Sequence, residues 1–305
     1  MSEPDQATRC GFVALIGAPN AGKSTLLNQL VGAKISIVSR KVQTTRTQVR
    51  GIALSGTAQI IFVDTPGIFA PKRRLDRAMV TSAWGGATDA DLIGVLIDVA
   101  RFDHEENTAL FERLAELKQP KFLILNKIDT VPKEKLLAIT AAVNERGSFE
   151  TTFMVAALTG YGVKDILTWL EKRLPLGPWL YPEDQISDAP LRFLAAEITR
   201  EKMFERLHDE LPYRSTVETE SWQQKPDGSV RIEQTIYVER EGQRKIVLGE
   251  GGQTIKAIGQ KARVEIAEAA EAKVHLFLFV KVRENWSDDP ERYREMGLEF
   301  PKGKG

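Results

Sequence analysis

The chain has 305 residues, enough for two domains that each bury a core of their own. Its 42 basic and 42 acidic residues cancel, so any nucleic-acid-binding surface must be local rather than global. A single cysteine, Cys10, excludes an internal disulfide framework, and without a signal-peptide pattern or an apolar run of ~18 residues we expect a cytoplasmic protein.

The first half of the chain alternates short apolar runs with longer amphipathic segments. The runs are five to nine residues long and mostly β-branched or aliphatic, at 12–16, 60–64, 92–100, 121–125 and 153–158. That length is typical of strands buried on both faces, whereas buried helices would be longer. A hairpin with its turn at Ser55-Gly56 adds one antiparallel strand. We therefore predict an α/β domain with a mixed, mostly parallel sheet.

The composition changes at 174–190, where four prolines predict a stiff linker. The segments beyond it follow the order α-β-β-α-α-β, which indicates a small α+β domain. Its last strand is VHLFLFVKV (274–282), whose apolar residues we expect to be core. The predicted boundaries are a flexible N-terminus at 1–10, a first domain at 11–178, a linker at 179–190 and a second domain at 191–305.

Residues 17–24, GAPNAGKS, match the phosphate-binding pattern G-x-x-x-x-G-K-[ST] and lie between a predicted strand and a predicted helix. Backbone amides and the helix N-terminus would face the phosphates, and Lys23 would place a charge at the β- and γ-phosphates. Ser24 would offer its hydroxyl to Mg²⁺. The predicted contacts in this loop are Gly17, Ala18, Pro19, Asn20, Ala21, Gly22, Lys23, Ser24 and Thr25.

Three further motifs follow the ends of predicted strands, where open α/β sheets bind ligands. Asp64 would order Mg²⁺ through water, and the Gly67 amide would approach a γ-phosphate. Asp129 can accept two hydrogen bonds from guanine, whereas adenine lacks both donors. A loop after the last strand can place an amide against guanine O6. These motifs predict a guanine-nucleotide site, with further contacts from Asp64, Thr65, Pro66, Gly67, Ile68, Asn126, Lys127, Ile128, Asp129, Ala156, Ala157 and Leu158.

The polar segment 39–48 lies between the first two motifs and contains a threonine that would complete the Mg²⁺ shell. Thr44 and Thr45 both qualify, and we predict Thr45. The predicted metal set is Ser24, Thr45 and Asp64, and the predicted catalytic set is Lys23, Thr45 and Gly67. Ile68 stands where many GTPases carry a water-orienting glutamine. We expect slow intrinsic hydrolysis, or a water positioned by another group or by a partner.

A second glycine loop, Gly249-Glu250-Gly251-Gly252, lies between two predicted helices of the second domain. In a domain of this order such a loop is typical of a KH module, where it lets an RNA backbone approach closely. Residues 240–263 carry six cations against two carboxylates, a net charge of +4. The alternatives are a helix-breaking turn and a solvated basic face. The predicted RNA contacts are Lys245, Gly249, Glu250, Gly251, Gly252 and Lys256.

The motifs GAPNAGKS, QTTR, DTPG and NKID, followed by the linker GPWLYPEDQISD, resemble the bacterial Era GTPases over nearly all of the chain. The resemblance implies a P-loop GTPase domain followed by a type II KH domain, with GTP or GDP and Mg²⁺ as cofactors. It implies binding to the 3′ end of small-subunit ribosomal RNA, a role in 30S assembly, and some peripheral association with the inner membrane. We expect a monomer.

This sequence departs from the family at Ala156, where the family commonly has serine. The guanine-facing amide remains, but a hydroxyl that could brace the loop is lost. Two alternative functions stay open: a P-loop ATPase or kinase, and an RNA-binding scaffold that GTP orders while hydrolysis is vestigial.

Overall fold

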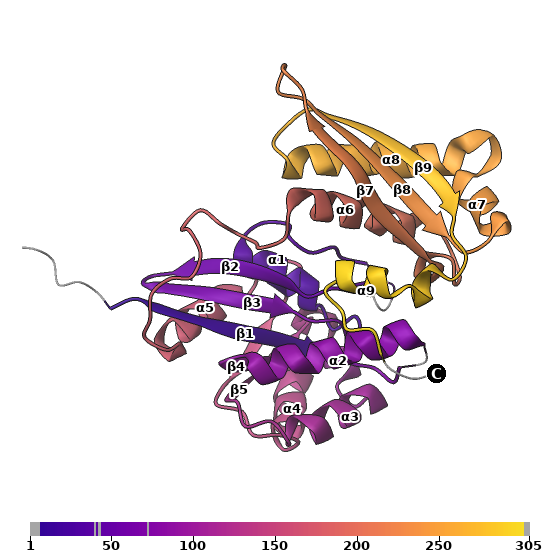
Figure 1. Ribbon diagram of the computed structural model, residues 1–305. Helices are drawn as coiled ribbons and strands as arrows, with labels where there is room; N and C mark the ends of the chain where they lie inside the picture. The colour runs from indigo at the N-terminus through magenta and orange to yellow at the C-terminus, as the bar shows by residue number, and fades with distance from the viewer. Residues whose placement is uncertain (1–6, 40, 42–43, 72, 302–305) are drawn as a thin grey trace, which may run out of the picture. The chain divides into compact units, whose positions relative to one another are not determined.

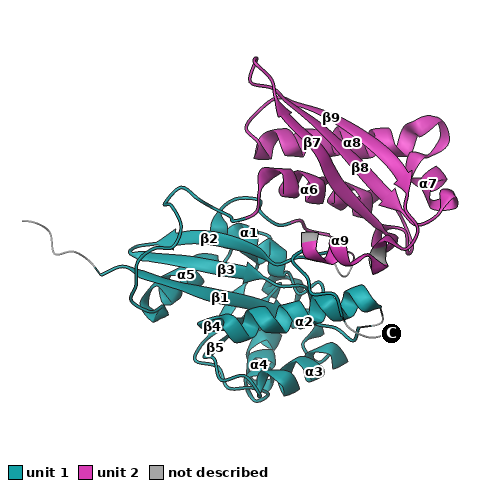
Figure 2. Cartoon of the chain, viewed as in Figure 1, with its two compact units in different colours: residues 1–36, 42–188, 296–305 teal, residues 37–41, 189–295 magenta. Residues whose placement is uncertain are grey.

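The computed structural model describes residues 7–39, 41, 44–71 and 73–301, and Figure 2 divides the chain into two compact units. The first unit comprises residues 1–36, 42–188 and 296–305, and the second comprises 37–41 and 189–295. Residues 1–6 of the predicted flexible N-terminus lie outside the described residues. The first strand begins at Arg9, earlier than the predicted domain start at residue 11.

The first unit contains a six-stranded sheet in the order β2-β3-β1-β4-β5-β6 (Figure 1). β2 pairs with β3 antiparallel, through the predicted turn, and every other neighbour is parallel, which confirms the predicted mixed, mostly parallel sheet. The strands are β1 (Arg9–Gly17), β2 (Val49–Ser55), β3 (Ala58–Asp64), β4 (Leu92–Asp98), β5 (Lys121–Asn126) and β6 (Thr152–Val155). The helices are α1 (Lys23–Val31), α2 (Arg74–Asp89), α3 (Glu105–Leu114), α4 (Lys133–Asn144) and α5 (Val163–Arg173).

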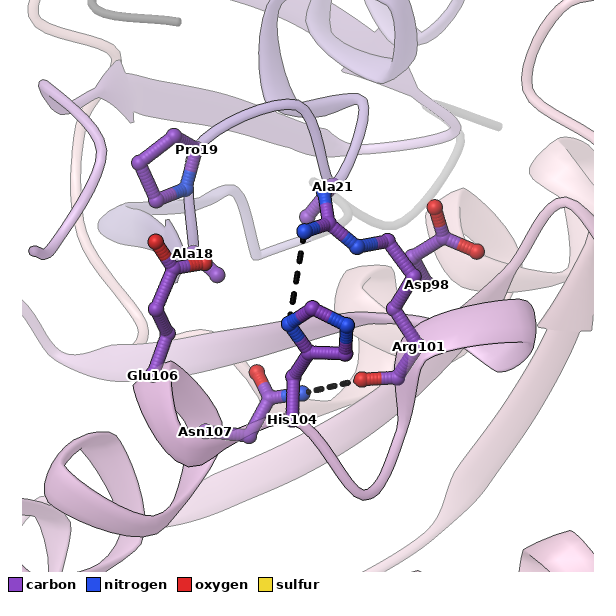
Figure 3. Close-up of a pocket in the computed structure, with 8 residues that line it drawn as sticks. All are labelled: Ala18, Pro19, Ala21, Asp98, Arg101, His104, Glu106 and Asn107. Atoms are coloured by element: carbon purple, nitrogen blue, oxygen red, sulfur yellow. Dashed lines mark hydrogen bonds between the residues drawn. The ribbon is translucent and has the colours of Figure 1, made fainter.

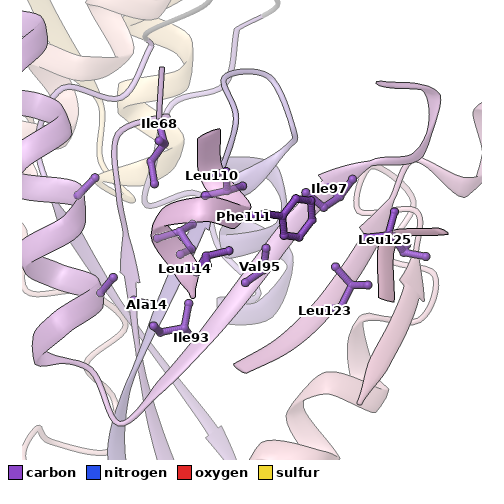
Figure 4. Packing of buried hydrophobic residues seen from close by; sticks show 14 of the residues in the cluster. Ala14, Ile68, Ile93, Val95, Ile97, Leu110, Phe111, Leu114, Leu123 and Leu125 are labelled. Carbon is purple, nitrogen blue, oxygen red and sulfur yellow. The ribbon is translucent and has the colours of Figure 1, made fainter. Parts of the chain in front are cut away.

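Helices cover both faces of this sheet, which explains the unbroken apolar runs in its strands. Every residue of β3 is buried. α1 and α5 pack against β2 and β3, whereas α2, α3 and α4 pack against the opposite face. The core on the second face joins side chains of β1, β4 and β5 to those three helices (Figure 4). Because all strands except β2 run parallel, their carboxyl ends lie at one edge of the sheet.

The second unit has the predicted order α-β-β-α-α-β. It consists of α6 (Leu191–Arg206), β7 (Ser215–Gln224), β8 (Val230–Val238), α7 (Glu241–Leu248), α8 (Gln253–Ala269) and β9 (Val274–Val282), followed by α9 (Pro290–Glu295). The sheet order is β7-β8-β9, antiparallel between β7 and β8 and parallel between β8 and β9. Its inner face forms two apolar clusters with α6, α7 and α8.

The expectation that all apolar residues of β9 are core is wrong for Phe277, Phe279 and Val282, and the last of these is 37% exposed at the end of the strand. Phe277 and Phe279 are 43% and 49% exposed. Successive side chains of a strand point to opposite faces, so only the alternate residues of β9 can face the helices. Those residues are Val274, Leu276, Leu278 and Val280, which join the two apolar clusters.

The predicted linker at 179–190 is hydrogen-bonded to the first unit over much of its length. The Trp179 indole donates to the Thr57 carbonyl oxygen at 3.1 Å, and the Ile52 amide donates to the Ile186 carbonyl oxygen at 2.9 Å. Ser187 forms an antiparallel bridge with Gly51 of β2. The prolines prevent regular structure here, but the segment follows the sheet edge instead of spanning solvent.

Candidate functional site

The two glycines of the phosphate-binding pattern are required by their surroundings in the strand-to-helix turn. A β-carbon on Gly17 would lie 2.4 Å from the Leu96 carbonyl oxygen of β4. Gly22 has φ of 102°, and a β-carbon there would lie 2.3 Å from the Asn126 side-chain amide. A larger residue at either position would push the loop off the strand ends. The loop is therefore fixed against β4 and against the NKID motif.

Lys23 begins α1, and its side chain lies across the phosphate-binding loop. Its Nζ donates to the carbonyl oxygens of Gly17 and Ala18, both at 3.1 Å. Burial lowers the pKa of Lys23 to about 8, and the carboxylates of Asp64 and Glu106 partly oppose that shift. A buried ammonium in a loop of this kind is positioned for an anionic group.

The three predicted metal-set residues lie together at the end of β3. The Ser24 hydroxyl donates to Asp64 Oδ2 at 2.8 Å and lies 3.0 Å from the Thr45 hydroxyl. Ser36, which the sequence analysis missed, also donates to Asp64 Oδ2 at 2.8 Å. No described group hydrogen-bonds Asp64 Oδ1, although that oxygen is buried. Two hydroxyls beside a buried carboxylate oxygen without a partner fit an oxygen-coordinated Mg²⁺ held partly through water.

Electrostatics in this group are dominated by burial. Burial raises the pKa of Asp64, while Lys23 and the neighbouring hydroxyls act in the opposite direction. A dication at this position would favour the ionised carboxylate. Gly67, in the DTPG turn that follows Asp64, packs against the phosphate-binding loop, because a β-carbon on it would lie 3.0 Å from Pro19 Cα.

The NKID motif holds two loops in place at the carboxyl end of β5. Asn126 donates to the Ala21 carbonyl oxygen at 2.8 Å and accepts from the Ala157 amide at 3.0 Å. Lys127 donates to the Asn20 carbonyl oxygen and to Asp98 Oδ2, both at 2.7 Å. Asp129 is exposed beside them. The predicted Ala156–Leu158 loop, the phosphate-binding loop and Asp129 therefore surround one place at the sheet edge.

A pocket beside the phosphate-binding loop adds residues that the sequence did not indicate (Figure 3). Ala18, Pro19 and Ala21 form one wall, and the first turns of α3 and its preceding loop form the other. Arg101 lies 3.3 Å from His104 Nδ1, and Asn107 donates to the Arg101 carbonyl oxygen at 2.8 Å. The pocket thus places side chains of both charge signs next to the loop, among them Asp98, Arg101, His104, Glu106 and Asn107.

Ile68 has a structural role. Its side chain is 6% exposed and joins the apolar cluster between the sheet and α2 (Figure 4). Its amide donates to the Gly17 carbonyl oxygen at 3.1 Å. A side chain buried in this core does not reach a water at the phosphates, so no glutamine-like role is available to it.

The second glycine loop ends α7 and begins α8. Gly249, Gly251 and Gly252 all have positive φ, between 57° and 78°. A β-carbon on Gly251 or Gly252 would meet nothing within 4 Å, so the loop faces open space. Lys245 and Lys256 are exposed on the two helices beside it. A backbone with open surroundings between two cations is suited to close approach by a phosphodiester chain.

Comparison with known proteins accords with this arrangement. The family model described as 50S ribosome-binding GTPase matches residues 12–127, and the KH domain model matches residues 210–287. GTPase Era of Mesorhizobium japonicum is 70% identical over 295 residues, covering 97% of this chain and 95% of that protein. GTPase Era of Rhizobium meliloti is 67% identical over 295 residues, covering 97% and 94%.

Two solved structures match nearly the whole chain. One is Era in complex with MgGDPNP and nucleotides 1506–1542 of 16S ribosomal RNA, with a TM-score of 0.90 and 36% identity. It covers 95% of this chain and 99% of its own. The other is an Aquifex aeolicus Era variant bound to GDP·AlF₄⁻, with the same TM-score, identity and coverage.

A phosphate loop, a guanine-type NKID motif and a glycine loop in an α-β-β-α-α-β unit define a P-loop GTPase that carries a KH domain. The chain belongs to the GTPase Era family. The predicted fold class and the resemblance are both confirmed, and membership of a GTPase family disfavours the ATPase alternative.

Proposed function

We propose that this chain binds and hydrolyses GTP at the strand-end motifs and binds the 3′ end of small-subunit ribosomal RNA through the glycine loop, assisting 30S assembly and rRNA maturation. The observation that carries the proposal is the meeting of Lys23, Ser24, Thr45 and Asp64 at one sheet edge. The relative crystallised with MgGDPNP and a 16S rRNA fragment supports both halves of it. Crosslinking the protein to rRNA with GTP or GDP bound tests the whole.

Each nucleotide-site residue has a definite part in this proposal. Ser24 and Thr45 would hold Mg²⁺ through their hydroxyls and Asp64 would hold it through water. When bound, the ion would neutralise charge on the β- and γ-phosphate oxygens. Lys23 would move from the loop carbonyls to those phosphates, and the Gly67 amide would face the γ-phosphate.

Hydrolysis is expected to be slow in the isolated protein, because the Ile68 side chain is buried in the core and cannot orient the attacking water. Multiple-turnover hydrolysis with and without small ribosomal subunits checks this. Acceleration by the subunits supports a hydrolysing assembly factor. Hydrolysis that stays negligible in both conditions supports the scaffold alternative, in which GTP only orders the structure.

Asp129→Asn is expected to shift preference from guanosine to xanthosine nucleotides. An amide donates to the 2-oxo group of xanthine but no longer accepts both guanine donors, so GTP affinity falls by roughly tenfold to a hundredfold. Competition of GTP and XTP for a fluorescent nucleotide measures the change. Asp165→Asn, at an exposed position on α5, is the matched control. Unchanged relative affinities would remove Asp129 from the base site.

Thr45→Ala is expected to spare GDP binding and to weaken Mg²⁺-dependent GTP binding by about tenfold. The reason is that the Thr45 hydroxyl, 3.0 Å from Ser24, would join the Mg²⁺ shell only when a γ-phosphate is present. Calorimetric titration with each nucleotide, with and without Mg²⁺, measures it. Thr44→Ala is the neighbouring control, and equal losses for GDP and GTP would contradict the assignment.

We also propose a monomer in the cytoplasm with some peripheral association with the inner membrane. The family resemblance supports this proposal. Sedimentation of the purified protein and fractionation of cells test it. Among the described residues, none of the helices is long and apolar enough to cross a bilayer.

A further inference from the structure

The outer face of the β7-β8-β9 sheet carries two exposed phenylalanines at its β9 side. Phe277 and Phe279 are 43% and 49% exposed, and they pair in register with Glu233 and Thr235 of β8. Alternate residues of a strand share a face, so the two rings stand in one row about 7 Å apart along β9. Burial of such rings is usually favoured, so their exposure calls for an occupant of this face.

Two cations, Arg231 and Lys281, lie beside the two rings. The Arg231 guanidinium lies 4.6 Å from the centroid of the Phe277 ring. His275 and Lys281 continue the same row, and β9 itself contains no carboxylate. Glu233 is the one acid opposite the row, and it is bonded to Arg231 at 2.6 Å. The ring pair therefore has the Arg231 guanidinium over Phe277 and Lys281 next to Phe279 in the row.

Apart from Glu233 of β8, the acidic residues of this face lie on β7, at the other side of the sheet, and they have partners. Glu218 forms an ion pair with Arg292 of α9 at 2.7 Å, and Glu220 accepts a hydrogen bond from the Tyr237 hydroxyl at 2.8 Å. The charge thus changes sign across the sheet. A polyanion would follow the β9 side and avoid the β7 side.

The β9 side is also continuous with the glycine loop. β9 is the edge strand of its sheet and packs against α7 and α8, the two helices that the loop connects. The Arg244 side chain of α7 donates to the Val280 carbonyl oxygen of β9. A single strand of RNA that leaves the loop along β9 has to pass around the outer edge of this strand to reach the two rings, because no further strand lies beyond β9.

We propose that Phe277 and Phe279 form a stacking platform for bases of the RNA that extends beyond the nucleotides held at the glycine loop. This inference rests on the proposed RNA-binding function of that loop. Stacking on aromatic rings within a cationic groove is the usual way in which proteins hold single-stranded nucleic acid without a strict sequence requirement. A protein partner would require a wider apolar surface than two rings surrounded by charged side chains.

The test compares a five-nucleotide RNA, which fills only the loop, with a ten-nucleotide RNA of the same 5′ sequence taken from the 3′ end of 16S rRNA. The double variant Phe277→Leu/Phe279→Leu is expected to bind the longer RNA at least about tenfold more weakly and the shorter one unchanged. Phe277→Tyr/Phe279→Tyr keeps the aromatic faces and is expected to bind both as wild type does. Leu137→Ser, at an exposed apolar residue of α4, is the control.

Each outcome decides a separate point. A leucine variant that binds the longer RNA as tightly as wild type overturns the stacking platform. A leucine variant that keeps RNA affinity but loses binding to small ribosomal subunits assigns the face to a protein and also overturns it. If wild type binds neither RNA, the proposed RNA binding by the glycine loop is wrong, and this result differs from the one that contradicts the stacking platform alone. Circular dichroism confirms that each variant is folded.

Discussion

Lys23→Ala is expected to lower the affinity for GTP and for GDP by roughly a hundredfold each, about 3 kcal/mol. The ammonium is buried against the Gly17 and Ala18 carbonyl oxygens, at the position where the β-phosphate common to both nucleotides would be bound. Alanine removes that charge and leaves the loop amides as the main source of positive potential. Titration with fluorescent GDP and GTP analogues measures the loss.

The loss should come from binding more than from unfolding, because the desolvation relieved by removing the buried ammonium offsets the two lost hydrogen bonds to the Gly17 and Ala18 carbonyl oxygens. Thermal unfolding of Lys23→Ala is therefore expected to resemble that of wild type. Lys135→Ala, at an exposed lysine of α4, serves as the control for the loss of one positive charge. Wild-type affinity in a folded Lys23→Ala variant would show that the loop does not bind phosphate in the proposed way.

The same lysine gives nucleotide binding a pH dependence. Burial lowers the pKa of Lys23 to about 8, and bound phosphates would raise it again. Binding therefore takes up a proton above pH ~8, and the affinity of wild type should fall as pH rises through that value. The Lys23→Ala variant should lack this fall, which distinguishes the lysine from other groups that titrate in the same range.

Gly251→Asp combined with Gly252→Asp is expected to abolish detectable binding to the rRNA fragment while leaving GTP affinity nearly unchanged. Both glycines face open space, so the new carboxylates would project to where the RNA backbone would lie. Side chains there block close approach, and two added charges repel phosphates. The nucleotide motifs lie in the other unit, on a separate sheet. Fluorescence anisotropy with labelled RNA measures the effect.

Two controls separate charge from backbone strain in that experiment. Asparagine at both positions has a similar volume and tolerates positive φ, so it isolates the contribution of charge. Gly228→Asp changes an exposed glycine with φ of 79° in the β7–β8 turn and should not affect RNA binding. A folded double-aspartate variant that binds RNA as tightly as wild type would reduce the glycine loop to a helix turn.

Local patterns in the sequence predicted most of the first unit because its strands are buried on both faces. A continuous apolar run that ends in a polar motif predicts that the motif lies at the carboxyl edge of the sheet. Asp98 was missed although it ends a buried strand as Asp64 does, and that signal could have identified it. Ser36 carries no such signal, because only the folded chain brings it within 2.8 Å of Asp64.

The second unit shows where such patterns fail. The run VHLFLFVKV is too uniformly apolar for its two faces to be distinguished, so the exposure of Phe277 and Phe279 depends on a three-stranded sheet covered by helices on one side. The proline-rich segment was predicted as a linker because prolines exclude regular helix and strand. Composition carries no information on tertiary hydrogen bonds, such as those that Gln59 accepts from the Leu180 and Tyr181 amides at 2.8 and 3.0 Å.

That proline-rich segment has a further consequence for the solubility of the first domain. β2 is an outermost strand of its sheet, and an uncovered outermost strand offers its amides and carbonyls to the next copy of the chain. The bridge from Ser187 to Gly51 and the bond from the Ile52 amide to Ile186 occupy those groups. Residues 179–188 therefore protect the sheet against edge-to-edge aggregation, and a domain fragment cut at residue 178 would lose that protection.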